Sequence, residues 1–395
     1  MKKFILMTLT IALALLPLSA CGGGEEPPKE DAPATLNVCV DLRRVGGTAV
    51  SDMLLSVPGS GKEFTLLMET IPAEGSEREN SMQRVRTEIL AGKGPDIFLC
   101  DAAQLLYDDG VLFPFPRQVM ENRIFLPMDD YIGKAQYMEW DKLLPKIMEA
   151  GKNADGQQLL PLGYEFQMYV MEKSQGEPTF GHPLSGELTG QMALYNVLGE
   201  LADYDNDRLA LSEEELLENC LEQLDRFKSA KELPVKFAYI SEGAFTTMGE
   251  NRPEPLDLKD TEHWMLSGPN ISGGITANIT CFAGINRNTK HPAEAFRVLD
   301  FLLSEDLLTR SPIYNLALPV HSQLGTEDHP WHGRYMSQGN FEEFLGLIDK
   351  IDVVKFYTPL DDLVYDAWDL NAGEDELKEL CHKAYVKMNM YLAES

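Results

Sequence analysis

Short apolar runs alternate with a helical pattern in the first hundred residues. The β-prone or apolar runs lie at 36–40 (LNVCV), 64–68 (FTLLM) and 96–99 (DIFL). Between the last two, apolar residues recur three or four positions apart, which predicts an amphipathic helix that ends at Gly92. This β/α/β order predicts a parallel or mixed sheet. The apolar positions of the helix are Met82, Val85, Ile89 and Leu90.

The rest of the chain predicts three further helices and one long strand. Ser212 and Glu215 have the spacing of a capping box, which opens a helix. Residues 275–285 predict a strand with polar interruptions, and Pro292 predicts the first turn of the next helix. A last helix is expected at the C-terminus. The three apolar faces are Leu216, Leu217, Cys220, Leu221, Leu224 and Phe227; Ala295, Phe296, Leu299, Leu302 and Leu303; and Leu377, Leu380, Cys381, Ala384, Tyr385, Met388, Tyr391 and Leu392.

Residues 1–20 have the pattern of a signal peptide. Two lysines precede an apolar run at 4–16, and small residues follow it. The run is shorter than the roughly 20 apolar residues of a membrane-spanning helix. The sequence LSAC at 18–21 resembles the lipobox of bacterial lipoproteins, which implies that Cys21 is acylated, for example with palmitate, and anchors the chain to a membrane. The alternative is a plain secretory signal with an incidental cysteine.

Residues 21–34 predict a flexible tether behind that anchor. The segment 22–34 (GGGEEPPKEDAPA) has no large apolar side chain and is rich in glycine, proline and charge. Such a segment cannot bury enough surface to order itself. The folded body is therefore expected to begin near Thr35, outside the cytoplasm and at the surface of the cell membrane.

Composition and charge exclude several partners of that body. The 395 residues are 44% hydrophobic, which is enough for two or three domain-sized cores. The formal net charge is -29, and the 34 basic residues form no cluster after the signal peptide. Nucleic acids and anionic lipids both need a basic surface, so neither is an expected partner.

The cysteines and histidines give no support for a metal or a cofactor. No cysteine pair has zinc-like spacing, and the seven histidines show no paired metal spacing. The acidic loop 203–214 has calcium-like spacing, but its turn glycine is replaced by Arg208. Cysteines beyond Cys21 are interpreted as buried small side chains, with a bridge between Cys39 and Cys100 as the less favoured alternative. We expect neither a metal nor a cofactor.

Several ordered motifs resemble the sugar-binding branch (family 1) of extracellular solute-binding proteins, the receptors of ABC importers. The resemblance covers about 35–320, with a poor match over 170–265. The motifs are ILAGKGPDIFLCD at 89–101, LPMDDYI at 126–132, DGQQLLPLGYE at 155–165, ITANITCFAGINRNTKHPAEAFRVLDFLLSE at 275–305 and LPV at 318–320.

The resemblance implies an α/β fold of the two-lobe, periplasmic-binding-protein-like kind (type II). Mixed sheets flanked by helices form each lobe, and crossover strands join the lobes. One lobe is expected from 35–155 plus 273–320. The other is expected from 156–272 plus 321–395.

Candidate ligand-binding residues follow from strand ends and crossings. In open α/β sheets the ligand crevice lies outside the carboxyl ends of the strands, and tryptophans in polar loops can stack on a sugar ring. No catalytic residue is proposed, because the chain has no GxSxG elbow and its many carboxylates mark no site by spacing alone. The candidates are Asp41, Asp101, Tyr164, Glu165, Trp264, Ser272, Gly273, Gly274 and Trp331.

The favoured function is that of a monomeric receptor, not an enzyme. It captures a small solute, most simply a sugar or oligosaccharide, and delivers it to the permease subunits of an ABC importer. Two alternatives stay open at this point. One is a secreted glycan-active enzyme, and the other is a sensing or adhesion protein that binds without transport.

Overall fold

A computed structural model describes most of the chain after the N-terminal segment. Cys21 and Trp331 lie outside the described residues, as does the whole predicted signal peptide. The described residues are 33–43, 45–104, 110–178, 194, 196–229, 236–241, 244–248, 253–308, 317–322, 336–369 and 371–394.

A seven-stranded mixed sheet forms the larger core. Its order is β15-β6-β14-β3-β1-β2, and β16 also pairs with β14. The runs expected as strands at 36–40, 64–68 and 96–99 form parallel neighbours, with β1 between β2 and β3. The strands are β1 (Ala34–Asp41), β2 (Phe64–Thr70), β3 (Ile97–Asp101), β6 (Leu159–Phe166), β14 (Ile275–Ile285), β15 (Leu318–Pro319) and β16 (Ile351–Phe356).

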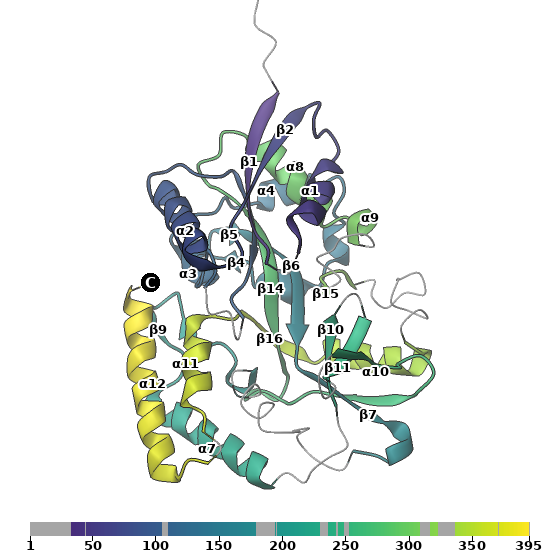
Figure 1. The fold of residues 1–395 in the computed structure, drawn as a ribbon, viewed down its shortest axis with the longest axis vertical. Coiled ribbons are helices and arrows are strands. Elements are labelled where there is room, and N and C mark those ends of the chain that lie inside the picture. Colours follow the sequence, from purple (N-terminus) through teal and green to yellow (C-terminus); the bar gives the residue numbers. More distant parts are fainter. Residues whose placement is uncertain are drawn as a thin grey trace, which may run out of the picture. The chain divides into compact units, whose positions relative to one another are not determined.

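The second sheet is antiparallel and has the order β12-β11-β10-β7-β13. Two strand-to-strand passages link it to the first sheet (Figure 1). In one, β6 continues through Gln167 into β7, and in the other, β13 leads through 267–274 into β14. The strands are β7 (Met168–Glu172), β10 (Lys236–Ser241), β11 (Ala244–Met248), β12 (Pro253–Pro255) and β13 (His263–Leu266); two small hairpins are β4 (Lys152–Asn153) with β5 (Gly156–Gln157) and β8 (Ala202–Asp203) with β9 (Arg208–Leu209).

Helices cover both sheets. In the first core, α8 packs on β1 and β14, and in the second, α10 packs on β13. The helices are α1 (Gly47–Leu55), α2 (Gly75–Leu90), α3 (Pro116–Glu121), α4 (Asp129–Ile132), α5 (Pro145–Glu149), α7 (Glu213–Ser229), α8 (Pro292–Leu302), α9 (Glu305–Leu308), α10 (Gln338–Ile348), α11 (Pro359–Ala367) and α12 (Glu374–Glu394). The α/β class expected from the sequence is therefore confirmed.

The predicted helix between β2 and β3 is α2, with one error in its apolar face. Met82, Val85 and Ile89 are buried as expected, but Leu90 is 84% exposed. The buried face instead includes Arg78, a charged residue that periodicity of apolar side chains cannot reveal. Arg78 is buried because it forms an ion pair with Asp41 beneath the helix.

A separate helical core is built by α7, α11 and α12. The capping box is confirmed, since the backbone N–H of Ser212 donates to the Glu215 carboxylate and that of Glu215 donates to the Ser212 hydroxyl. Most of the predicted α12 face is buried, whereas Tyr391 is 43% exposed. Figure 1 shows α12 beside α11, and α7 packs against α12 as well. No helix in the described part of the chain is long and apolar enough to span a membrane.

The five cysteines of the folded body are all buried, and none of them is in a disulfide. Cys39 and Cys100 lie in the adjacent strands β1 and β3 without a bond between them, so the bridge considered from the sequence is wrong. Burial raises the pKa of the Cys39 thiol, and nearby Asp41 adds to this effect. A neutral, buried thiol reacts slowly.

Thiol titration tests this arrangement. A Cys21→Ser variant kept free of reductant should show five reactive thiols in urea, because no described cysteine is in a disulfide. In native buffer the same reagent should react far more slowly, since all five side chains are buried. The control is the same protein reduced before unfolding, which should also give five. A count of three without reductant would reveal a disulfide.

Candidate functional site

Along one edge of β14, the neighbouring strand changes from β16 to β3. Residues 281–285 of β14 pair with β3, which runs antiparallel. Residues 275–279 of β14 pair with β16, which runs parallel. The carboxyl ends of β3 and β16 therefore face each other at Thr280, where the register between β14 and β6 also shifts. Ligand crevices of open α/β sheets lie at such switch points, so this place is the candidate site.

The candidate Asp41 lies at the end of β1 and is bound on all sides by protein groups. The guanidinium of Arg78 donates to both carboxylate oxygens, at 2.6 and 3.1 Å, and the backbone N–H of Leu112 donates at 2.9 Å. Asp41 is 1% exposed. The same Arg78 also donates to the carbonyl of Gly110. Asp41 thus holds the segment around Gly110–Leu112 against β1, and it pairs with Cys100 next to the end of β3.

Asp101 ends β3 directly at the switch point. It pairs with Cys281, and the next residue, Ala102, donates its N–H to the Thr280 carbonyl. The Asp101 carboxylate accepts a hydrogen bond from the backbone N–H of Arg43 at 2.8 Å. This bond joins the end of β3 to the segment after β1. Asp101 is buried, with 4% exposure, so one of its roles is to fix the two strand ends together.

Tyr164 and Glu165 on β6 face opposite sides of the sheet, because successive residues of a strand alternate. Glu165 pairs with Asn278 and Tyr164 pairs with Ile279, and directly paired residues project to the same face. Tyr164 is fully buried, and burial raises the pKa of its phenol. Glu165 is half-buried. Only one of these two side chains can therefore face a ligand at the switch point. Glu165 is the one that is partly exposed.

Buried amides near the switch point escaped the sequence analysis. Asn278 donates to Asn196 at 2.7 Å, while its own carbonyl oxygen accepts no bond from the described residues. Both amide atoms of Gln104, three residues after β3, also lack a partner among them, as does the amide nitrogen of Gln167. Buried polar groups normally have hydrogen-bond partners, so these amides are candidates for solute contacts. The polar interruption at Asn278 was the one sequence signal for them.

The candidates Ser272, Gly273 and Gly274 lie elsewhere, at the start of β14. Cys281 lies seven positions after Gly274, on the order of 23 Å along a strand. The Ser272 hydroxyl bonds to Asp352, and a Cβ on Gly274 would lie 2.1 Å from the Asp352 carboxyl carbon. Protein therefore already fills the space beside Gly274. Ser272 and Gly273 line a hollow of about 410 Å³ together with Val197, Asn219, Glu222, Gln223, Arg226, Pro269, Asn270 and Ile271.

Trp264 lies on β13 in the second sheet and is half-buried. Its indole N–H donates to the Gly176 carbonyl at 2.9 Å, and the ammonium of Lys173 lies 4.8 Å from the ring centroid. One face of the indole is thus in contact with a cation. The other expected stacking residue, Trp331, is outside the described residues.

Comparison with known proteins identifies the fold. No protein-family model and no curated protein matches the chain. Among solved structures, a family 1 extracellular solute-binding protein of Alicyclobacillus acidocaldarius aligns over 92% of this chain and 100% of its own, with a TM-score of 0.55 and 11% identity. A periplasmic oligogalacturonide-binding protein of Yersinia enterocolitica aligns over 91% and 99%, with a TM-score of 0.58 and 13% identity.

The chain has the two-lobe fold of the extracellular solute-binding proteins. The resemblance expected from the motifs is confirmed at the level of fold. A de novo designed cysteine esterase also aligns, over 92% of this chain and 98% of its own, with a TM-score of 0.59 and 12% identity. The fold alone therefore does not separate binding from catalysis.

A cluster of charged side chains lies at the carboxyl end of β16, with Lys355 inside the strand. The ammonium of Lys355 donates to Asp361 at 2.5 Å and to the Gly199 carbonyl at 2.7 Å. The side chains of Lys355 and Asp361 are both almost fully buried. The neighbouring Glu200 lies 3.6 Å from the guanidinium of Arg117 in α3. Burial raises the pKa of Glu200 to about 7, opposed by Arg117 and Lys355 and reinforced by Asp361.

Glu200 should make the stability depend on pH. Its pKa is higher in the folded protein than the ordinary value of 4.5, so the folded state binds the proton more tightly. Stability from this group is full below about pH 4.5 and is lost as the pH rises through 7. The free energy of unfolding of Glu200→Gln, minus that of the parent, should therefore rise between pH 5 and 8 in urea titrations.

The matched control is Glu218→Gln, an exposed position on α7. Its difference from the parent should stay within about 0.5 kcal/mol over the same range. A Glu200→Gln difference that is flat with pH would contradict the raised pKa.

Proposed function

We propose that the chain is a receptor that captures a small solute, a sugar or oligosaccharide, at the switch point around Thr280. The observation that carries the proposal is the convergence of the ends of β3 and β16 beside a crossover strand with polar side chains. Carboxylates and amides there, from Asp101, Glu165, Asn278 and Gln104, have the chemistry that bonds sugar hydroxyls. The name of the Yersinia protein, which binds an oligogalacturonide, supports a carbohydrate ligand.

The proposal includes closure of two lobes. We assign 35–155 plus 273–320 to the first and 156–272 plus 321–395 to the second, which places two of the junctions just before β6 and just before β14. A solute that binds the closed state more tightly shifts the population toward it. This division stays a prediction. It gives β6 and β16 to the second lobe, although both strands pair with β14 of the first.

Delivery to an ABC permease is part of the same proposal. The signal pattern and the lipobox-like LSAC support an extracytoplasmic, lipid-anchored receptor, and such a receptor has an importer as its natural partner. Two permease genes beside this gene would favour import over sensing or adhesion.

Glu165 tests the site. Once a glycan panel has supplied a solute that raises the melting temperature, Glu165→Gln should weaken its binding about tenfold or more in calorimetry, because a hydrogen bond to a charged group contributes about 1.5 to 3 kcal/mol. Glu254→Gln, an exposed glutamate of β12, is the matched control and should bind as the parent does. Equal affinities for all three proteins would place the solute elsewhere.

The same incubation separates a receptor from an enzyme. A receptor returns its solute intact and shows a stoichiometric thermal shift. Recovery of a cleaved glycan would favour the alternative hypothesis, a glycan-active enzyme. The designed esterase that aligns with this chain shows that the fold can carry catalysis.

Cys21 tests the anchor. If acyl chains on this residue hold the protein at the membrane, Cys21→Ser should move the protein from the membrane fraction to the soluble fraction. The measurement is an immunoblot of both fractions, with Cys220→Ser, a buried thiol of the helical core, as the control that should stay in the membrane. Unchanged fractionation of Cys21→Ser would contradict the prediction that the protein is a lipoprotein.

A further inference from the structure

A hollow with an aromatic wall lies at the opposite end of β6 from the switch point. Its volume is about 360 Å³, within the range of roughly 300–1,000 Å³ found for small-molecule sites. Eight positions separate Gln157, which lines it, from Glu165, a distance on the order of 25 Å along extended chain. The lining residues of this Trp140 hollow are Asp129, Ile132, Trp140, Asp141, Leu143, Pro145, Met148, Glu149, Lys152 and Gln157.

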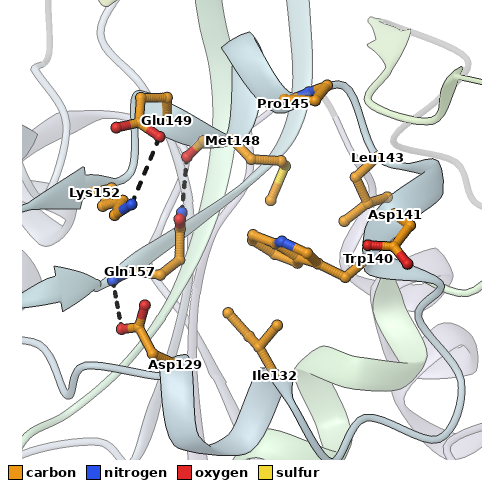
Figure 2. A pocket seen from close by; sticks show the side chains of 10 residues that line it. All are labelled: Asp129, Ile132, Trp140, Asp141, Leu143, Pro145, Met148, Glu149, Lys152 and Gln157. Carbon is orange, nitrogen blue, oxygen red and sulfur yellow. Dashed lines mark hydrogen bonds and ion pairs between the residues drawn. The ribbon is translucent and has the colours of Figure 1, made fainter.

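Trp140 gives the hollow its apolar surface. Figure 2 shows the indole ring in the middle of the lining residues, among the side chains of Ile132, Leu143 and Met148. Trp140 is half-buried, so it is packed on one side and accessible on the other. No described residue accepts a hydrogen bond from its indole N–H. An aromatic ring with one open face and an available donor is suited to stack on a sugar ring.

Hydrogen bonds hold the walls in place. The buried side-chain amide of Gln157 donates to the carbonyls of Met148 in α5 and Leu159 in β6, at 2.8 and 2.7 Å. The carboxylate of Asp129 in α4 accepts from the backbone N–H of Gln157 at 2.9 Å (Figure 2). Three segments, α4, α5 and residues 157–159, are thereby fixed around Trp140. Such preorganisation reduces the ordering cost of binding.

Four charged side chains form the rim of the hollow. Asp129, Asp141 and Glu149 carry carboxylates and Lys152 carries an ammonium, a formal charge of -2 from three negative groups and one positive group. Glu149 and Lys152 lie 3.9 Å apart and are both exposed. Carboxylates accept hydrogen bonds from hydroxyl or ammonium groups and repel acidic ligands.

We propose that the Trp140 hollow is a second carbohydrate-binding site, which takes a single sugar residue that is neutral or carries an amino group. The ring of this residue stacks on Trp140, and its hydroxyl or amino groups bond to the carboxylates of the rim. The site is separate from the switch point and does not depend on solute capture there.

Indole N–H signals in nuclear magnetic resonance spectra test the proposal. The chain has four tryptophans, and the signal that disappears in Trp140→Phe belongs to Trp140. Glucose and glucosamine at millimolar concentrations should shift this signal, whereas glucuronate, a ring of the same size with an acid group, should not. Glu165→Gln should leave the shifts unchanged, which separates this site from the switch point.

A charge reversal supplies the second measurement. Asp141→Lys changes the rim charge from -2 to 0 and lies on the surface, so the protein should fold; it should weaken glucosamine binding about tenfold. The control is Asp130→Lys, an exposed neighbour on α4 that does not line the hollow, which should weaken it less than threefold. The proposal is overturned if neither glucose nor glucosamine shifts the Trp140 signal, if glucuronate shifts it equally, or if both lysine variants bind alike.

Discussion

The fold depends on one constraint, the need to pair a fully buried strand along both edges. All eleven residues of β14 are buried, so its backbone N–H and C=O groups must find protein partners. β6 pairs with one edge along most of its length, while β3 and β16 divide the other edge. Because these two strands approach from opposite directions, their carboxyl ends meet at Thr280. The position of the candidate site thus follows from which strands supply the backbone hydrogen bonds of β14.

Two buried ion pairs support the strand ends that this pairing creates. Asp41 and Arg78 fix the segment around Gly110 beside β1, and Lys355 and Asp361 fix α11 after β16. Removing one partner of a buried pair typically costs about 3 to 5 kcal/mol, because the other charge is left unpaired. Asp361 also accepts from the backbone N–H of Thr358 in the capping box of α11. These charges therefore act mainly by holding the ends of β1 and β16 in place.

Patterns of apolar residues predicted the elements well, because burial of one face imposes a period that can be read locally. The runs that became β1, β2 and β3, the capping box of α7 and the start of α8 at Pro292 all have such signals. The site was harder to predict. Strand pairing decides that Asp101 lies opposite Cys281 and that Glu165 lies opposite Asn278. The pairing of β14 with β16 joins residues 76 or 77 positions apart, such as Ile275 and Ile351. Arg78 was missed because its burial requires Asp41, a partner in another element.

A sequence motif can identify the correct strand and still include residues with different roles, because successive side chains of a strand point to opposite faces. Tyr164 and Glu165 are neighbours in sequence, but they project to opposite faces of β6. The fully buried Tyr164 belongs to the core, whereas the half-buried Glu165 lies beside Asn278 on the face that also carries polar groups. The same strand begins next to Gln157 and the Trp140 hollow. A single crossover strand thus connects two polar surfaces at its two ends, and the buried residues between them keep those surfaces apart.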